Sequence, residues 1–268
     1  IDRFDVLTPN ETVPAFALSG GNQQKLVVGR ELSANPKILI AAHPTRGVDI
    51  GAQAAIWAEL RRARVLRPFV DDADLLLDVH SMREPCEALM VCGADGRGGD
   101  KGVALSRQLG VPGVLLVDTG HPSGLRMIER GAFADPRDAR TAVLIECGQH
   151  WERAAADVAQ DTLLRFLAHA GALDDGYLQP RLQAQAQTPP APRQRLLRVT
   201  EAVVAHSPGF RFARPFRGLQ VLPRAGELIA TDGTLRFHAP HDDTVLVMPS
   251  VTPPKVGATM VRLGRYEA

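Results

Sequence analysis

The first part of the chain alternates between helical and strand-like hydrophobic patterns. Residues 19–34 have the pattern of a helix, with Ser19 as its N-cap and Pro36 just beyond its end. The short apolar run 37–42 lies between helix breakers and predicts a buried strand. Apolar residues then recur at helical spacing over 50–70, which predicts an amphipathic helix. These patterns together indicate a helix–strand–helix unit.

The middle of the chain continues with strands separated by helices. This alternation is typical of a largely parallel sheet with helices packed on its faces. The glycine-rich segment DGRGGD (95–100) could mimic a phosphate-binding loop, but it lacks the Lys-Ser/Thr pair of such loops and favours a mobile surface loop. The predicted strands are 74–81, 88–93, 113–118 and 141–148, and the predicted helices are 101–109 and 151–171.

The hydrophobic period changes to two after a proline-rich segment. Residues 178–194 are rich in Gln, Ala and Pro and predict a linker. Beyond it, short apolar runs alternate with Gly, Pro and Asp-Gly turns, which predicts a small β-rich domain over 195–268. The expected fold class is therefore α/β, with a partial, mostly parallel sheet flanked by helices and a small C-terminal all-β domain.

Composition and charge exclude several classes of partner. Of the 268 residues, 45% are hydrophobic and 23% are charged, which is ordinary for a globular protein. The formal net charge is +1, so no overall field draws the chain to nucleic acid or to a membrane. No apolar run approaches the ~20 residues that span a bilayer. The three cysteines form no C-x-x-C pair, and their odd number indicates a reducing, cytoplasmic setting.

A motif near the N-terminus has the chemistry of a phosphate site. In LSGGNQQK (18–25), the Ser-Gly-Gly sequence lies at the predicted start of a helix, where free N–H groups and the helix dipole favour an anion. The motif resembles the signature sequence of ATP-binding-cassette ATPases from sugar and nucleoside importers. The resemblance covers about residues 5–57. It implies that the nucleotide-signature residues are Ser19, Gly20, Gly21 and Gln24.

The sequence lacks the other parts of an ATP site. The phosphate-cradling G-x-x-x-x-G-K-[ST] loop occurs nowhere in it. The strand that ends in two acidic residues in these ATPases ends here in Ala42 and His43. We therefore expect residues 18–64 to serve as a packing unit that does not bind ATP. A transporter permease would be a partner only under the alternative interpretation as an importer subunit.

A second set of motifs resembles a different class of protein. The segments DADLLLDVHSM, GVALSRQLGVP, VDTGHPSG and AVLIECGQHWE are similar to the succinylglutamate desuccinylase/aspartoacylase family of zinc carboxypeptidase-like hydrolases. The resemblance covers about residues 59–268. It implies a catalytic zinc with three protein ligands, whose bound water has a pKa of about 7. It also implies a small N-acyl amino acid as substrate.

The resemblance assigns roles to particular residues. It makes His80 the third zinc ligand and Glu146 the general base that carries a proton from water to the leaving amine. Asp78 lies on the same face of the strand as His80 and could orient a ligand through a hydrogen bond. Taken alone, a histidine or glutamate at a strand end is more often structural. His121 and His150 could bind substrate, with polar loop contacts as the alternative.

The family's other zinc ligands have no counterpart upstream. The family supplies them from an H-x-x-E motif, and none occurs before His80. The chain changes from one resemblance to the other within ELRRAR (59–64), inside a predicted helix. We interpret it as a fusion of an ATPase segment, 1–58, with a truncated hydrolase domain, 59–177, and expect zinc binding to be weak or absent. Three functions stay open: an impaired amide hydrolase, an importer ATPase fragment, or an inactive fusion product.

Overall fold

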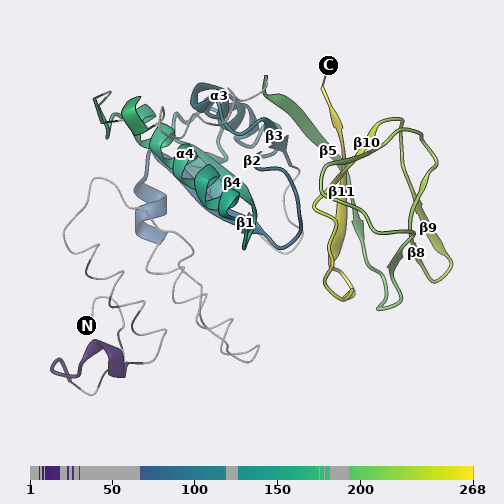
Figure 1. Cartoon of the computed structure of the whole chain (residues 1–268), viewed down its shortest axis with the longest axis horizontal. Helices are drawn as coiled ribbons and strands as arrows, with labels where there is room; N and C mark the ends of the chain where they lie inside the picture. Colours follow the sequence, from purple (N-terminus) through teal and green to yellow (C-terminus); the bar gives the residue numbers. More distant parts are fainter. Residues whose placement is uncertain are drawn as a thin grey trace. The chain divides into compact units, whose positions relative to one another are not determined.

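The structure is a computed structural model of the whole chain (Figure 1). The chain divides into two compact units, Ile1–Ala73 and Asp74–Ala268, and each is described by itself. The residues that the structure describes are 6, 8, 10–18, 23, 26, 30, 67–118, 126–174, 176, 177, 179–181 and 193–267.

The described part of the first unit is small. Ala15–Ala17 form a short 3-10 helix, η2, and residues 67–72 are helical. Val6 is buried and packs against Leu18 and Phe69. The predicted strand 37–42 and most of the predicted helices 19–34 and 50–70 lie outside the described residues, so these stay predictions.

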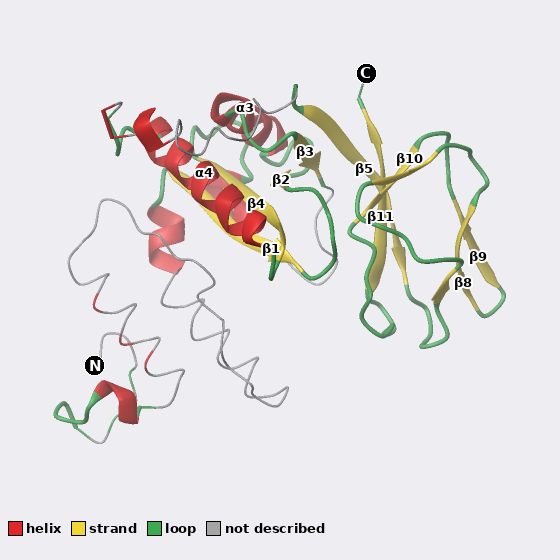
Figure 2. Cartoon of the chain, in the orientation of Figure 1, coloured by secondary structure: helices red, strands yellow, loops and turns green. Residues whose placement is uncertain are grey.

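An eight-stranded sheet organises the second unit (Figure 2). In chain order its strands are β1 (Leu75–Met82), β2 (Leu89–Cys92), β3 (Val114–Val117), β4 (Thr141–Gln149), β5 (Arg195–Val204), β7 (Gln220–Leu222), β10 (Thr244–Val247) and β11 (Thr259–Tyr266). The spatial order is β1-β4-β2-β3-β5-β11-β10-β7. The pairs β1–β4, β2–β3 and β3–β5 are parallel, whereas β2 and β4 are antiparallel. The pairs β5–β11, β11–β10 and β10–β7 are antiparallel as well, so the prediction of a mostly parallel sheet is confirmed for the five strands β1, β4, β2, β3 and β5.

Two helices cover one face of the parallel part of the sheet (Figure 1). They are α3 (Gly99–Leu109) and α4 (Arg153–His169). Val103 of α3 and Phe166 of α4 share one buried apolar cluster with Met90 and Ile145 of the strands. Burial of this cluster explains why the strand segments are apolar and why apolar residues recur at helical spacing in α3 and α4.

The C-terminal part is built from strands, as predicted (Figure 2). A second sheet of three strands, β6 (Arg211–Phe212), β8 (Leu228–Asp232) and β9 (Leu235–His238), packs with the end of the first one around a separate apolar cluster. Strand β5 belongs to both parts, because its first residues pair with β3 and most of its length pairs with β11. The sheet is thus continuous across the predicted division of the chain at 178–194, and separate folding of the two parts stays a prediction.

One predicted boundary is wrong. Helix α3 begins at Gly99, so the last two residues of DGRGGD are helical rather than loop. Gly98 caps the helix with φ of 86°, and a Cβ at this position would lie 2.2 Å from the Phe133 carbonyl oxygen. Both facts restrict position 98 to glycine. None of the described helices is long and apolar enough to cross a membrane.

The core under α3 and α4 provides a test of the fold. Leu115→Ala removes a side chain that is 1% exposed, and we expect it to lower the free energy of unfolding by about 2–5 kcal/mol. Urea denaturation of the full chain measures this loss. Leu235→Ala, at a side chain 45% exposed, is the control and should cost less than about 1 kcal/mol. Equal losses in the two variants would contradict the core described above.

Candidate functional site

The parallel pairing of β1 and β4 brings two of the predicted site residues together. His80 and Glu146 are direct partners in the register of these strands. Val79 and Ile145, their chain neighbours, belong to the cluster under the helices. Because successive side chains of a strand alternate between faces, His80 and Glu146 lie on the opposite face of the sheet, side by side.

Asp78 holds the ring of His80. The Nε2 atom of His80 lies 2.9 Å from Asp78 Oδ1, and the two side chains are 47% and 11% exposed. This hydrogen bond raises the pKa of His80, burial opposes the rise, and the charges of Asp78 and Glu146 add to it. This contact is the one that the predicted role of Asp78 requires, and the role itself stays a prediction.

Glu146 is a partly buried carboxyl group with a raised pKa. Burial raises its pKa to about 7; His80 opposes this rise and Asp78 adds to it. Its Oε2 atom is buried and has no hydrogen-bond partner among the described residues. A buried polar atom without a partner is costly and calls for an explanation, and a catalytic role is one such explanation. At neutral pH this carboxyl group can both accept and release a proton.

His150 is the other described residue for which the sequence predicts a role in the site. The Nδ1 atom of His150 lies 2.7 Å from Ser81 Oγ. Ser81 follows His80 at a point where the register of β1 and β4 is irregular, so strand alternation does not fix the face on which it lies. The substrate-binding role predicted for His150 stays a prediction. His121 and the nucleotide-signature residues Ser19, Gly20, Gly21 and Gln24 lie outside the described residues, and their roles stay predictions.

A buried network of charges that sequence reasoning missed lies at the end of β3. Asp118 is 1% exposed; Arg126 Nη1 donates to its Oδ2 atom at 2.7 Å, and Arg262 Nε of β11 lies 3.2 Å from its Oδ1 atom. Arg126 also donates to Glu129 Oε1 at 2.7 Å. These ion pairs satisfy charges that burial would otherwise penalise. The arginines stand far apart in the sequence and outside any motif, so no local signal identifies them.

The described residues do not form a metal site by themselves. A catalytic zinc requires three protein ligands, and no group of three His, Cys, Asp or Glu side chains in the described ranges could hold a metal ion. His80 with Asp78 behind it fits the usual arrangement of one histidine ligand and its supporting carboxylate. The part of the chain described here therefore offers one candidate ligand and one candidate base.

The sequence comparisons match only a short segment. No protein-family model matches the chain. It is 62% identical over 64 residues to the guanosine import ATP-binding protein NupO of Bacillus subtilis, and 48% identical over 64 residues to the nucleoside import ATP-binding protein NupA of Lactococcus lactis. Each match covers 24% of this chain, and only 12% and 13% of the respective relative. The chain thus spans about an eighth of the length of these curated relatives.

The structure comparisons match most of the chain to another class of protein. Succinylglutamate desuccinylase from Vibrio cholerae superposes with a TM-score of 0.53 at 14% identity, covering 90% of this chain and 75% of that one. The enzyme from Vibrio parahaemolyticus gives 0.52 at 16% identity, with 88% and 68% covered. A succinylglutamate desuccinylase/aspartoacylase from Rhodobacter sphaeroides gives 0.51 at 16% identity, with 78% and 63% covered. The chain therefore has the fold of these proteins, together with a segment similar to importer ATPases, as the sequence predicted.

The burial of Glu146 predicts a pH dependence of stability. Its pKa is raised in the folded state, from an ordinary 4.5 to about 7, so the stability due to its proton is present below pH 4.5 and is lost as the pH rises through 7. Glu146→Gln cannot lose this proton. Relative to the native chain we expect the variant to gain about 3 kcal/mol in free energy of unfolding between pH 4.5 and pH 8.

Denaturant titrations across this pH range, with a chelator present, measure the gain. The control is Glu152→Gln, at an exposed side chain just before α4, whose effect should stay within about 0.5 kcal/mol at every pH. A Glu146→Gln variant that follows the native pH curve would show that Glu146 is not a buried acid.

Proposed function

We propose that residues 59–268 are the C-terminal part of a zinc-dependent amide hydrolase of N-acyl amino acids, and that this chain is an impaired member of that class. The observation that carries the proposal is the pairing of His80 with Glu146 on one sheet face, with Asp78 bonded to the histidine. The proteins with the same fold include two named succinylglutamate desuccinylases, which supports a substrate of this chemical class.

Glu146 is assigned the role of general base. A base works best when its pKa lies near the working pH, and burial raises the pKa of Glu146 to about 7. It would take a proton from the attacking water and deliver it to the nitrogen of the leaving amine. Its unpartnered Oε2 atom is the acceptor in this role.

His80 is assigned as a metal ligand, and Asp78 as the group that fixes its ring. The family pattern requires two further ligands from an H-x-x-E motif, which the sequence before His80 lacks. One histidine does not supply the ligand set that fixes catalytic zinc, so the proposal includes weak metal binding and low activity.

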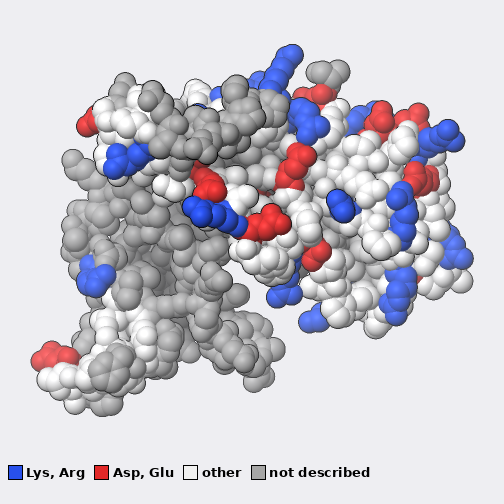
Figure 3. All heavy atoms as spheres, viewed as in Figure 1, with Lys and Arg blue, Asp and Glu red and all other residues white. Residues whose placement is uncertain are grey.

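The setting proposed for the chain is the cytoplasm, without nucleic-acid partners. The cysteines Cys86, Cys92 and Cys147 are all free, in keeping with a reducing compartment. Figure 3 shows both basic and acidic side chains on the described part of the visible surface, in keeping with the formal net charge of +1.

An importer ATPase fragment is the second candidate. The 62% identity to a guanosine import ATP-binding protein favours it for the matching segment. The missing G-x-x-x-x-G-K-[ST] loop argues against ATP hydrolysis, because that loop supplies the N–H groups and the lysine that hold the phosphates. Residues 18–64 are therefore proposed as a packing unit.

A graft of the missing half tests the hydrolase assignment. Replacing residues 1–58 with the N-terminal half of a desuccinylase that carries H-x-x-E should restore both zinc binding and amide hydrolysis. In the grafted protein, Glu146→Gln should keep the zinc and lower kcat by about 10²–10⁴-fold, because it removes the base and leaves the ligands. His80→Ala should lose the zinc.

Zinc content by mass spectrometry and hydrolysis of a panel of N-acyl amino acids are the two measurements. Glu152→Gln is the matched control, because its exposed side chain lies just before α4, and it should keep both zinc and rate. Full activity in Glu146→Gln would disprove the base assignment, and unchanged zinc in His80→Ala would disprove the metal site.

The ATPase candidate has its own test. The chain alone should show no binding of labelled ATP at micromolar concentration, since no phosphate-cradling loop is present in the sequence. Micromolar binding that Ser19→Ala abolishes would instead establish a working nucleotide site in the first segment.

A further inference from the structure

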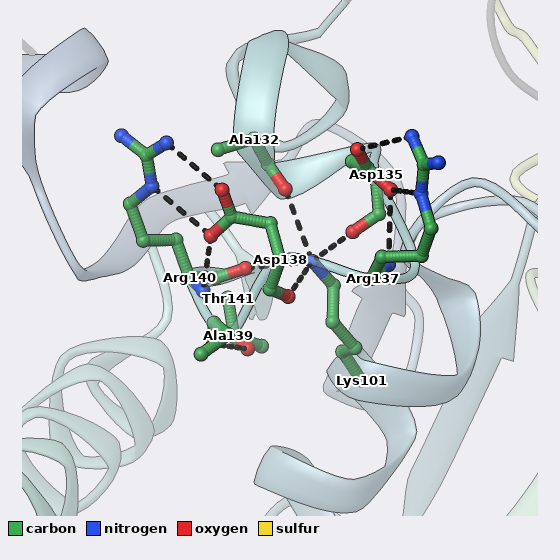
Figure 4. Close-up of polar contacts among 8 residues, drawn as sticks. All are labelled: Lys101, Ala132, Asp135, Arg137, Asp138, Ala139, Arg140 and Thr141. Carbon is green, nitrogen blue, oxygen red and sulfur yellow. Dashed lines mark hydrogen bonds and ion pairs between the residues drawn. The ribbon is translucent and has the colours of Figure 1, made fainter.

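The side chain of Lys101, in the first turn of α3, ends in a ring of backbone carbonyl groups (Figure 4). Its Nζ atom lies 3.0 Å from the carbonyl oxygen of Ala132, 2.7 Å from that of Asp135, 2.9 Å from that of Asp138 and 2.8 Å from that of Arg140. All four acceptors come from one segment, residues 131–140, which lies between β3 and β4 in the chain. Because these acceptors are main-chain oxygens, the backbone conformation of the segment determines where the ammonium group of Lys101 lies.

The contacts resemble the coordination of an ion more than a set of separate hydrogen bonds. An ammonium group has three N–H donors, and here it meets four acceptors at similar distances. At least one donor is therefore shared, and the attraction is largely that of a positive charge for four carbonyl dipoles. Rings of carbonyl oxygens of this kind replace the hydration shell of potassium ions in other proteins.

The local sequence explains why these carbonyls converge. Residues 135–140 read DPRDAR, which is the tripeptide Asp-x-Arg repeated twice. In each repeat the aspartate accepts hydrogen bonds from the backbone N–H and from the guanidinium of the arginine two residues later. Two consecutive turns result, with each carboxylate held by its own arginine (Figure 4). The main-chain carbonyls, rather than the carboxylates, then face Lys101.

Four convergent carbonyl oxygens repel one another unless a cation lies between them. Burial lowers the pKa of Lys101, whereas the charges of Asp138 and Asp135 raise it and Arg140 lowers it. The charged ammonium group therefore bears a desolvation cost that the four dipoles offset. Removing the charge while keeping the loop would leave the repulsion without compensation.

We propose that the carbonyl oxygens of Ala132, Asp135, Asp138 and Arg140 form a receptor for a monovalent cation, which the ammonium group of Lys101 fills in the native chain. Lys101 is a built-in substitute for an ion of the size of ammonium or potassium. A chain with a short side chain at position 101 becomes a protein that binds such an ion at this site.

The position of the receptor gives it a structural consequence. Arg140 immediately precedes β4, and the backbone N–H of Thr141 donates to the Asp74 carbonyl oxygen just before β1 at 2.9 Å. The carbonyl oxygen of Phe133, in the same segment, would lie 2.2 Å from a Cβ at Gly98, so this segment leaves no room for a side chain at the N-cap of α3. Cation binding thus fixes the entry of the strand that bears Glu146 against the first turn of a helix.

Two substitutions in the full chain separate cation binding from ordinary packing. Lys101→Ala empties the receptor, and Lys101→Met fills it with an uncharged side chain of similar length. We expect each to lower the Tm by about 5–10 °C in tetramethylammonium chloride, an ion too large for the ring. Exchanging that salt for about 0.3 M ammonium or potassium chloride should raise the Tm of Lys101→Ala by about 3–6 °C.

The same exchange should move the Tm of the native chain and of Lys101→Met by less than about 1 °C, because their receptors are filled. If Lys101→Ala is as stable as the native chain, or if its loss is the same in all these salts, the proposal is wrong. Should Lys101→Ala fail to fold in tetramethylammonium chloride, refolding yield replaces Tm. Recovery in ammonium or potassium then supports the receptor, and equal failure in every salt overturns it.

Discussion

The parallel pairing of β1 with β4 is the constraint on which the rest of the second unit depends. It fixes His80 beside Glu146, and through strand alternation it sends their neighbours Val79 and Ile145 into the cluster under α3 and α4. A shift of one residue in this register would exchange the faces, burying His80 and exposing the apolar set. The same hydrophobic burial that selects the register therefore also assembles the candidate site.

Two buried acids in this unit show how differently burial can be compensated. Asp118 is surrounded by Arg126 and Arg262, so its burial is matched by charge and it ties the end of β3 to β11. Glu146 has the basic group His80 and the acidic group Asp78 near it, and burial raises its pKa to about 7. Two arginines match the charge of Asp118, although its Oδ1 atom, like Glu146 Oε2, has no hydrogen bond among the described residues. Glu146 keeps an uncompensated desolvation cost, which is the physical signature of a group that exchanges protons.

Much of the fold follows from local pattern. Short apolar runs between breakers mark the strands, and the strand positions of His80 and Glu146 follow from such runs. Two features depend on contacts distant in sequence, and no local pattern encodes them: the antiparallel step between β4 and β2, and the sharing of β5. The carbonyl ring has a local cause in DPRDAR, but its contact with Lys101 joins residues far apart in the sequence. The pattern predicts a start at residue 101, whereas α3 begins at Gly99. The difference arises because Gly98, in the left-handed conformation, is the N-cap of the helix, and a local pattern of glycines does not distinguish such a cap from a loop.

A protein can keep a fold while losing the ligands of its active site, because the two depend on different residues. Stability in the second unit comes from the apolar cluster under the helices and from the one around Phe210, Ile229 and Leu246. Neither cluster contains His80 or Glu146. The pairing of His80 with Glu146 follows from the register of β1 and β4 and is separate from both apolar cores.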